Sequence, residues 1–324
     1  MSSATAFRQG IYQFEWARSM ARWLDALPHI SLALEVGPER VAAARWGRAG
    51  SLDGYAVESL PAGALVPSAV ETNLVNTAAV KAAVANVCDR LRAHDEDVAM
   101  ILPDTVIRVF VQHFEEFPRS AAEAEPMLRW KLKKSVPFEA DETVISYMRQ
   151  APRESGLDVV TALARLRIIR EYESLVEGSL YPGVVLSSSL AAIALLDDEK
   201  PTLLARISGC CLTTAIVRGG ILCGYRCTDL PALGADLTPQ MLLEEIFPVA
   251  AYYQDTWQET IRSVRVAGLG PRLPEFVKPI EDEFHCEVRS LLGSAVSEGR
   301  INEDALPLAD RDLEGLVGWV LQRG

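Results

Sequence analysis

The order of strands and breaks between residues 98 and 138 decides how the rest of this chain is interpreted. Residues 98–111 read VAMILPDTVIRVFV, and residues 136–138 read VPF. The apolar run from Val98 to Leu102 is typical of a buried strand, and Pro103 ends it because proline cannot donate to a sheet ladder. Residues 106–111 are rich in β-branched and aromatic side chains, which predicts a second strand. Two strands around a Pro-Asp turn therefore form the central landmark of the sequence.

A helix is predicted after the second strand, and its charges are unevenly distributed. Ser120 can cap it, and Glu123 and Glu125 fall in the first turn, where the positive end of the helix dipole favours acids. Pro126 is tolerated only near such a start. Two interpretations stay open for the basic cluster downstream: contact with lipid headgroups or an acidic partner segment, or a solvated helix end that complements the dipole. The cluster surrounds Trp130 and consists of Arg129, Lys131, Lys133 and Lys134.

The residues before this landmark predict an antiparallel sheet. Ile30–Val36, Arg40–Trp46 and Tyr55–Leu60 are strand-like runs separated by glycine-containing turns, which indicates a meander. A helix is expected over Ala78–Arg92. Residues 1–29 are interpreted as an N-terminal helical extension, with apolar residues at helical spacing between Phe7 and Leu27; it either lies on a membrane face or a partner, or packs on the first lobe.

A polar break at residues 197–201, DDEKP, divides the chain into two lobes. Lobe 1 is expected over residues 30–197 and lobe 2 over residues 198–324. Lobe 2 opens with a second meander, which indicates an internal repeat of the first. Its three strand-like runs are Leu203–Ile207, Cys211–Val217 and Ile221–Arg226. In the final helix, Gly315 and Gly318 permit close packing on a neighbour.

Length, charge and composition narrow the classes of function. A chain of 324 residues is long enough for two compact lobes. The formal net charge of -12 opposes nucleic-acid binding, which needs clustered basic residues, and favours a protein partner. Apolar runs are short and no secretory signal is evident, so the chain is expected in the cytoplasm. The six cysteines have no paired Cys-x-x-Cys spacing, so reduced thiols and no metal site are predicted.

These motifs resemble the PilM family of type IV pilus assembly proteins, which is actin-like and FtsA-like and related to the cytoplasmic domain of GspL. Besides residues 98–138, residues 34–41, LEVGPERV, resemble the family's first phosphate loop. Residues 268–274, GLGPRLP, resemble its adenosine loop, and residues 315–321, GLVGWVL, its last helix. The resemblance implies an α/β fold of the two-lobed actin-like (ribonuclease H-like) type. An FtsA/PilM-type subdomain would be inserted into lobe 1 at about residues 64–150, and the C-terminal helix, residues 311–322, would return to lobe 1.

By the same resemblance, a nucleotide site would lie between the lobes. An actin-type site uses glycine-bearing turns to face the phosphates and acids to hold Mg²⁺ through water. Arg206 stands where the second loop would carry its Asp, and Glu39 adds a carboxylate near the phosphates. A degenerate site without cofactor, metal or catalytic residue is therefore predicted; the alternative is bound ATP with Mg²⁺, with Arg206 contacting a phosphate. The candidate cofactor-binding residues are Glu35, Gly37, Gly209, Thr213, Thr214, Gly268 and Gly270.

The function that the resemblance implies is a cytoplasmic scaffold of the inner-membrane platform of a type IV pilus, and not an enzyme. It would dock the N-terminal tail of a PilN-like membrane protein in a groove bordered by the first meander and residues 98–111, where an extended peptide could gain backbone hydrogen bonds. Other pilus or secretion platform components are further expected partners, with peripheral association at the bacterial inner membrane. The alternatives are a GspL-like cytoplasmic domain of type II secretion and an actin-like kinase or ATPase.

Overall fold

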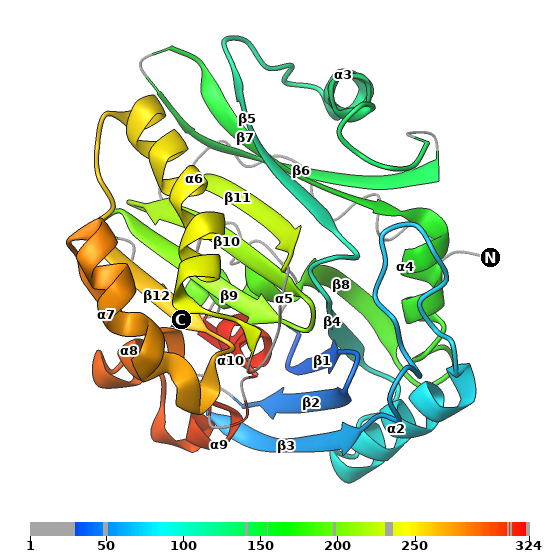
Figure 1. Ribbon diagram of the computed structural model, residues 1–324. Coiled ribbons are helices and arrows are strands. Elements are labelled where there is room, and N and C mark those ends of the chain that lie inside the picture. The colour runs from blue at the N-terminus through cyan, green and yellow to red at the C-terminus, as the bar shows by residue number, and fades with distance from the viewer. Residues whose placement is uncertain are drawn as a thin grey trace.

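The computed structural model describes residues 30–47, 51–139, 142–153, 155–196, 199–230, 236–309, 311 and 313–321. The predicted N-terminal extension and residues 197–198 at the expected lobe boundary lie outside these ranges. Within them, the chain forms two five-stranded sheets and one three-stranded sheet (Figure 1). No helix in this described part combines the length and the apolar character that a membrane span requires.

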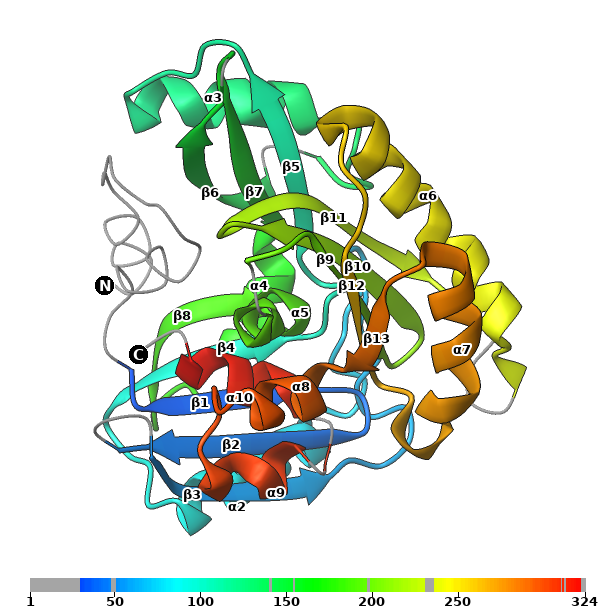
Figure 2. The ribbon, with the colours of Figure 1, turned by 90° about the vertical axis from the view of Figure 1, so that its left-hand side faces the viewer.

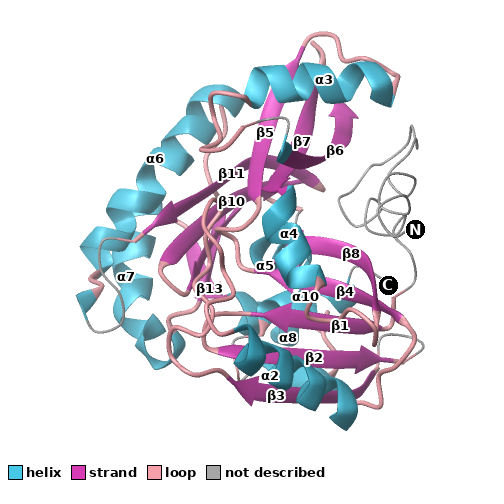
Figure 3. Ribbon diagram, turned by 90° about the vertical axis from the view of Figure 1, so that its right-hand side faces the viewer, coloured by secondary structure: helices cyan, strands magenta, loops and turns pink. Residues whose placement is uncertain are grey.

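The first sheet contains the predicted meander at one edge and parallel strands at the other. Its strand order is β3-β2-β1-β4-β8, with β1 parallel to β4 and β4 parallel to β8. Helix α2 (Thr77–Arg90) covers one face, and α5 (Ser188–Ala192) and α10 (Glu314–Leu321) cover the other (Figures 2 and 3). The strands are β1 (Leu32–Val36), β2 (Arg40–Trp46), β3 (Leu52–Ser59), β4 (Asp97–Leu102) and β8 (Tyr181–Ser187).

The second sheet repeats the topology of the first. Its order is β11-β10-β9-β12-β13, again a three-stranded meander followed by two parallel strands. This equivalence confirms the predicted two-lobed α/β fold. Strand β13 was not predicted from the sequence, because a run of four residues that includes two charged ones gives no strand signal. The elements are β9 (Thr202–Ser208), β10 (Cys211–Arg218), β11 (Ile221–Asp229), β12 (Ser263–Ala267), β13 (Glu287–Ser290), α6 (Pro239–Trp257), α7 (Leu273–Phe284), α8 (Leu291–Ser297) and α9 (Leu306–Ala309).

The third sheet is the module that contains the central landmark of the sequence. Strands β5 (Arg108–Phe114), β7 (Leu157–Arg165) and β6 (Thr143–Pro152) pair antiparallel in the order β5-β7-β6. The sheet thus extends past the expected boundary near residue 150, because β7 is its central strand. Sequence analysis did not predict β6, since most of its residues are half-buried and show no apolar-polar alternation.

Two helices accompany this third sheet. Helix α3 (Ala121–Leu132) packs on it through Leu128 and Leu132, but the side chain of Ser120 makes no capping hydrogen bond. Helix α4 (Leu166–Glu173) follows β7 directly, and turns follow Glu173. The side chain of Gln150 on β6 also bonds both backbone groups of Leu222 on β11, at 2.8 and 2.7 Å. The inserted sheet therefore contacts lobe 2 as well as lobe 1.

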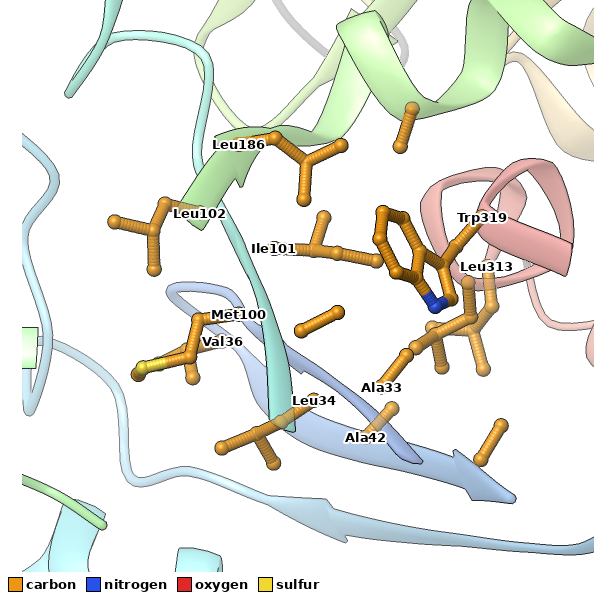
Figure 4. Packing of buried hydrophobic residues seen from close by; sticks show 14 of the residues in the cluster. Ala33, Leu34, Val36, Ala42, Met100, Ile101, Leu102, Leu186, Leu313 and Trp319 are labelled. Carbon is orange, nitrogen blue, oxygen red and sulfur yellow. The ribbon is translucent and has the colours of Figure 1, made fainter. Parts of the chain in front are cut away.

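The largest hydrophobic core joins the first sheet to α10 at the end of the chain. Figure 4 shows Trp319 beside Ile101, with Leu313 close to Ala33. A Cβ added at Gly318 would meet the backbone of α5, 2.8 Å from the carbonyl carbon of Ala191. The predicted close packing of the final helix is thereby confirmed, and its neighbours are α5 and β1.

Candidate functional site

A buried cluster of charged side chains lies where the two lobes meet. At its centre is Arg206 of β9, whose side chain is 3% exposed. Its Nη2 atom lies 3.2 Å from Glu314 Oε2 and 3.9 Å from Glu35 Oε1, and its Nη1 atom lies 3.4 Å from Asp104 Oδ2. Two carboxyl groups of lobe 1, and a third from the helix α10 that packs on lobe 1, therefore surround one guanidinium of lobe 2.

The topology explains why these side chains meet. Glu35 stands near the carboxyl end of β1, Asp104 follows β4, and Ser188 and Ser189 follow β8. These strands are parallel, so their carboxyl ends lie together at the same end of the first sheet. Polar residues that follow parallel strands of an open α/β sheet come close together at the carboxyl ends of the strands. Such folds bind their ligands there.

Asp104 is the most fully hydrogen-bonded member of the cluster. It accepts from the backbone N–H of Ser189 at 2.8 Å and from the Ser189 hydroxyl at 2.5 Å. From lobe 2, it accepts from Thr213 Oγ1 at 3.1 Å and from the Tyr225 hydroxyl at 3.4 Å. Together with Arg206, these donors satisfy a carboxylate that is 1% exposed, as burial of a charge requires.

Glu35 accepts fewer hydrogen bonds than Asp104. Its Oε1 accepts from Ser188 Oγ at 2.6 Å, while its buried Oε2 has no hydrogen-bond partner among the described residues. Burial raises the pKa of this carboxyl above its ordinary value, and the opposing effect of Arg206 is smaller. Burial by itself would lower the pKa of Arg206, but the Glu314, Asp104 and Glu35 carboxyls together raise it. The surrounding carboxyl groups thus stabilise the charged guanidinium, and burial shifts the pKa of Glu35 upward.

The structure brings some of the sequence-predicted site residues together and separates others. Glu35 and Thr213 belong to the cluster. Thr214 does not, because neighbouring residues of a strand point to opposite faces; its hydroxyl donates to the carbonyl of Arg226 at 3.4 Å on β11. Gly37 lies in the turn after β1, with its N–H bonded to the carbonyl of Arg40 at 2.9 Å.

The remaining predicted glycines lie at turns of lobe 2. Gly209, at φ +58°, connects β9 to β10, and a Cβ there would lie 3.6 Å from Pro38 of the first loop. The two loops therefore approach each other across the lobe interface. Gly268, at φ +83°, packs on Ile207 of β9 so closely that a Cβ would lie 2.8 Å from its carbonyl carbon, whereas Gly270 has open space around it. A left-handed turn and a close backbone approach account for glycine at residue 268.

Sequence analysis missed Asp104, Glu314, Ser188, Ser189 and Tyr225 as site residues. Asp104 and Arg206 are 102 residues apart, and Glu314 and Arg206 are 108 apart, so no local pattern links them. One signal was available: an acid directly after the Pro that ends a buried parallel strand stands at the ligand-binding edge of a sheet.

The cluster offers little to a magnesium nucleotide. Mg²⁺ prefers carboxylate oxygens and retained water, but the carboxylates of Asp104 and Glu314 already bond Arg206. A second cation there would be repelled by the guanidinium. In the described part of the chain, no group of three or more His, Cys, Asp or Glu side chains is arranged to hold a metal ion.

Comparison with solved structures identifies the fold. A chain of the PilM–PilN type IV pilus biogenesis complex matches with a TM-score of 0.68 and 17% identity, over 92% of this chain and 100% of that chain. The predicted resemblance is confirmed at the level of the fold, which is actin-like.

Two further structures match at lower scores. The cytoplasmic domain of EpsL, an inner-membrane component of the type II secretion system of Vibrio cholerae, has a TM-score of 0.44 and 12% identity over 72% of this chain and 80% of that chain. The ethanolamine utilization protein EutJ from Carboxydothermus hydrogenoformans has a TM-score of 0.48 and 11% identity over 92% and 90%. No family model and no curated protein matches the sequence.

Proposed function

We propose that this chain is a cytoplasmic scaffold of a type IV pilus inner-membrane platform and binds the N-terminal tail of a PilN-like membrane protein. The observation that carries the proposal is the fold shared, over the whole of that chain and 92% of this one, with a chain of the PilM–PilN complex. The chain acts by binding and not by catalysis in this proposal. Other platform components would be bound on further surfaces.

The strand pairings refine the docking place proposed for the tail. Strand β4 (residues 97–102) pairs with β1 on one side and β8 on the other, so its backbone has no free edge for a peptide. Strand β8 of lobe 1 and strand β6 of the inserted sheet each have one neighbouring strand. Both lie on the same side of the molecule (Figures 2 and 3). These two edges, between lobe 1 and the inserted sheet, fit the addition of an extended tail.

Tyr181 gives this docking place a testable side chain. It begins β8 and is 58% exposed, which is unusual for a large aromatic residue without a partner. A tail paired with the β8 edge would cover its ring. Tyr252 on α6 of lobe 2 is 63% exposed and offers a matched control on a different surface.

The test is titration of a synthetic peptide, the N-terminal cytoplasmic tail of the PilN-like protein from the same organism, by fluorescence anisotropy. The wild-type chain is expected to bind it saturably. Tyr181→Ala is expected to weaken binding by roughly tenfold, the usual effect of removing a buried aromatic anchor, and Tyr252→Ala to leave it unchanged. Absence of binding by the wild-type chain at high micromolar concentration would refute the scaffold function. Equal binding of the peptide by both variants would refute only the docking place at the β8 edge, and not the scaffold function.

The competing function is an actin-like kinase or ATPase. That function needs acids free to hold Mg²⁺ between the lobes. The pairing of Asp104 and Glu314 with Arg206 opposes it and supports a degenerate nucleotide site.

A further inference from the structure

Helix α3 has an outward face that no part of the described chain covers. Its inner face is formed by Ala124, Leu128 and Leu132, which recur every four residues and are buried on the third sheet. Trp130 lies on the opposite side of the helix, since two residues correspond to about 200° of rotation. Its side chain is 79% exposed, the largest exposed fraction among the bulky apolar side chains described.

The charge around Trp130 is opposite to that of the whole protein. Residues 126–138 contain four basic and no acidic residues, in a chain whose net charge is -12. Two of the four are engaged by the third sheet: Arg129 donates to the Thr143 carbonyl at 3.1 Å, and Lys131 Nζ lies 3.8 Å above the ring of Phe114. Lys133 and Lys134 are exposed.

Lys133 and Lys134 come directly after the last turn of the helix, to which Trp130 belongs. Lys133 is the C-cap residue of α3 and Lys134 lies in the turn that follows, so all three residues lie at the C-terminal end of α3. Neither forms an ion pair with another residue of the described ranges. The acid on this face, Glu123, precedes Trp130 by two turns. The C-terminal end of α3 therefore presents one bare indole and two unpaired ammonium groups.

Figures 2 and 3 agree on where this surface lies. Helix α3 forms one end of the molecule, outside the third sheet and far from the meander of lobe 1. In the described part of the chain, no other element lies beyond α3 at this end, so the helix can approach a flat surface. A peptide that adds to a sheet edge or lies in a groove uses a different kind of surface.

We propose that the surface formed by Trp130, Lys133 and Lys134 binds the headgroup region of an anionic phospholipid bilayer. Indole rings concentrate at the membrane–water interface because one end is apolar and the other polar. Lysines beside them gain attraction to anionic lipid within a Debye length of the surface. This inference goes beyond tail docking, because the protein itself contacts lipid. It rests on the proposed function only for the identity of the membrane, which would be the bacterial inner membrane.

The experiment is sedimentation of the full chain with vesicles, without any partner peptide. Vesicles of phosphatidylethanolamine and phosphatidylglycerol are compared with vesicles of phosphatidylcholine alone, at low and high salt. Binding is expected to the anionic vesicles, with a marked loss at high salt. Trp130→Ala and the double variant Lys133→Glu with Lys134→Glu are each expected to weaken binding by about tenfold or more.

Two control variants distinguish the effect of this surface on vesicle binding from the general effects of net charge and of an exposed aromatic ring. Lys81→Glu with Lys278→Glu changes two exposed lysines elsewhere and gives the same net charge as the test variant. Tyr252→Ala removes a comparably exposed ring on lobe 2. Both are expected to bind vesicles like the wild type.

Three outcomes would overturn the proposal: no binding to anionic vesicles, equal binding to phosphatidylcholine, or wild-type binding by both α3 variants. Weaker vesicle binding in the control variants to the same extent would also count against it. The tail-peptide titration is repeated on the α3 variants in the absence of lipid. Retained peptide binding with lost vesicle binding supports the lipid surface, whereas loss of peptide binding alone would assign this face to the protein partner.

Discussion

The stability of the lobe interface depends on one side chain more than on any other. Arg206→Met keeps the length of the side chain but leaves the Asp104 and Glu314 carboxylates buried without their cation. Removing one partner of a buried ion pair costs about 3–5 kcal/mol, so a loss of this size in the free energy of unfolding is expected by urea titration. Arg90→Met, which breaks the exposed pair with Glu58, is the control and should cost about 1 kcal/mol or less. Equal effects of the two substitutions would contradict a role for the cluster in joining the lobes.

A second prediction at this scale concerns pH and Glu35. Because its pKa in the folded protein is raised above the ordinary value of 4.5, the folded state binds more protons than the unfolded state above that pH. The contribution of Glu35 to stability is therefore fully present below about pH 4.5 and is lost as pH rises through the folded pKa. Glu35→Gln cannot lose a proton, so its stability relative to the wild type should increase with pH. Urea titrations from pH 4 to pH 8 measure this difference, with Glu39→Gln on the exposed neighbouring loop as control. A difference that is constant over this range would refute the assignment.

At the scale of elements, the docking of α10 leaves no space for an added methyl group at Gly318. In Gly318→Ala, the new Cβ would lie 2.9 Å from the Cα of Ala192 and closer still to the backbone of Ala191, neither of which can move freely. The strain is expected to outweigh the better helix propensity of alanine and to destabilise the protein by about 1–3 kcal/mol. Gly224→Ala on β11, where nothing lies within 4 Å of the added Cβ, is expected to change stability by less than about 0.5 kcal/mol. Thermal and urea unfolding of the two variants decide the matter, and an unchanged Gly318→Ala protein would show that α10 is loosely packed.

Elements with a strong local pattern were predictable from the sequence, and contacts between distant elements were not. The two meanders carry apolar runs bounded by glycine turns, so both appear in the structure near their expected ranges. Strand β6 lacks an apolar-polar alternation, and consecutive residues on both of its faces are half-buried. For the site, Arg206 marked a departure from an actin-type pattern, but its partners come from β1, the turn after β4 and α10. The parallel pairing of β1 with β4 brings Glu35 and Asp104 to one place, and the packing of α10 on α5 and β1 adds Glu314.

On the scale of the whole molecule, side-chain contacts join the two lobes. Arg206 connects lobe 2 to Glu35 and Asp104 of lobe 1 and to Glu314 of α10, which itself packs on lobe 1, and Gln150 connects the inserted sheet to Leu222 of lobe 2. The carboxylates of Asp104 and Glu314 at the lobe interface are therefore paired with Arg206.

The pairing of these carboxylates gives a prediction for nucleotide binding. Mg-ATP at millimolar concentration is expected to leave the melting temperature unchanged, because Arg206 already pairs with the Asp104 and Glu314 carboxylates that would otherwise hold Mg²⁺. A ligand present at 100 times its Kd would stabilise the folded state by about 2.7 kcal/mol, which a thermal shift detects easily. Inorganic triphosphate with Mg²⁺ and ATP with EDTA are the controls for effects of anion and ionic strength. A rise that saturates with ATP and requires Mg²⁺ would mean that Arg206 moves aside or contacts a phosphate, and it would favour a nucleotide-dependent function over the scaffold.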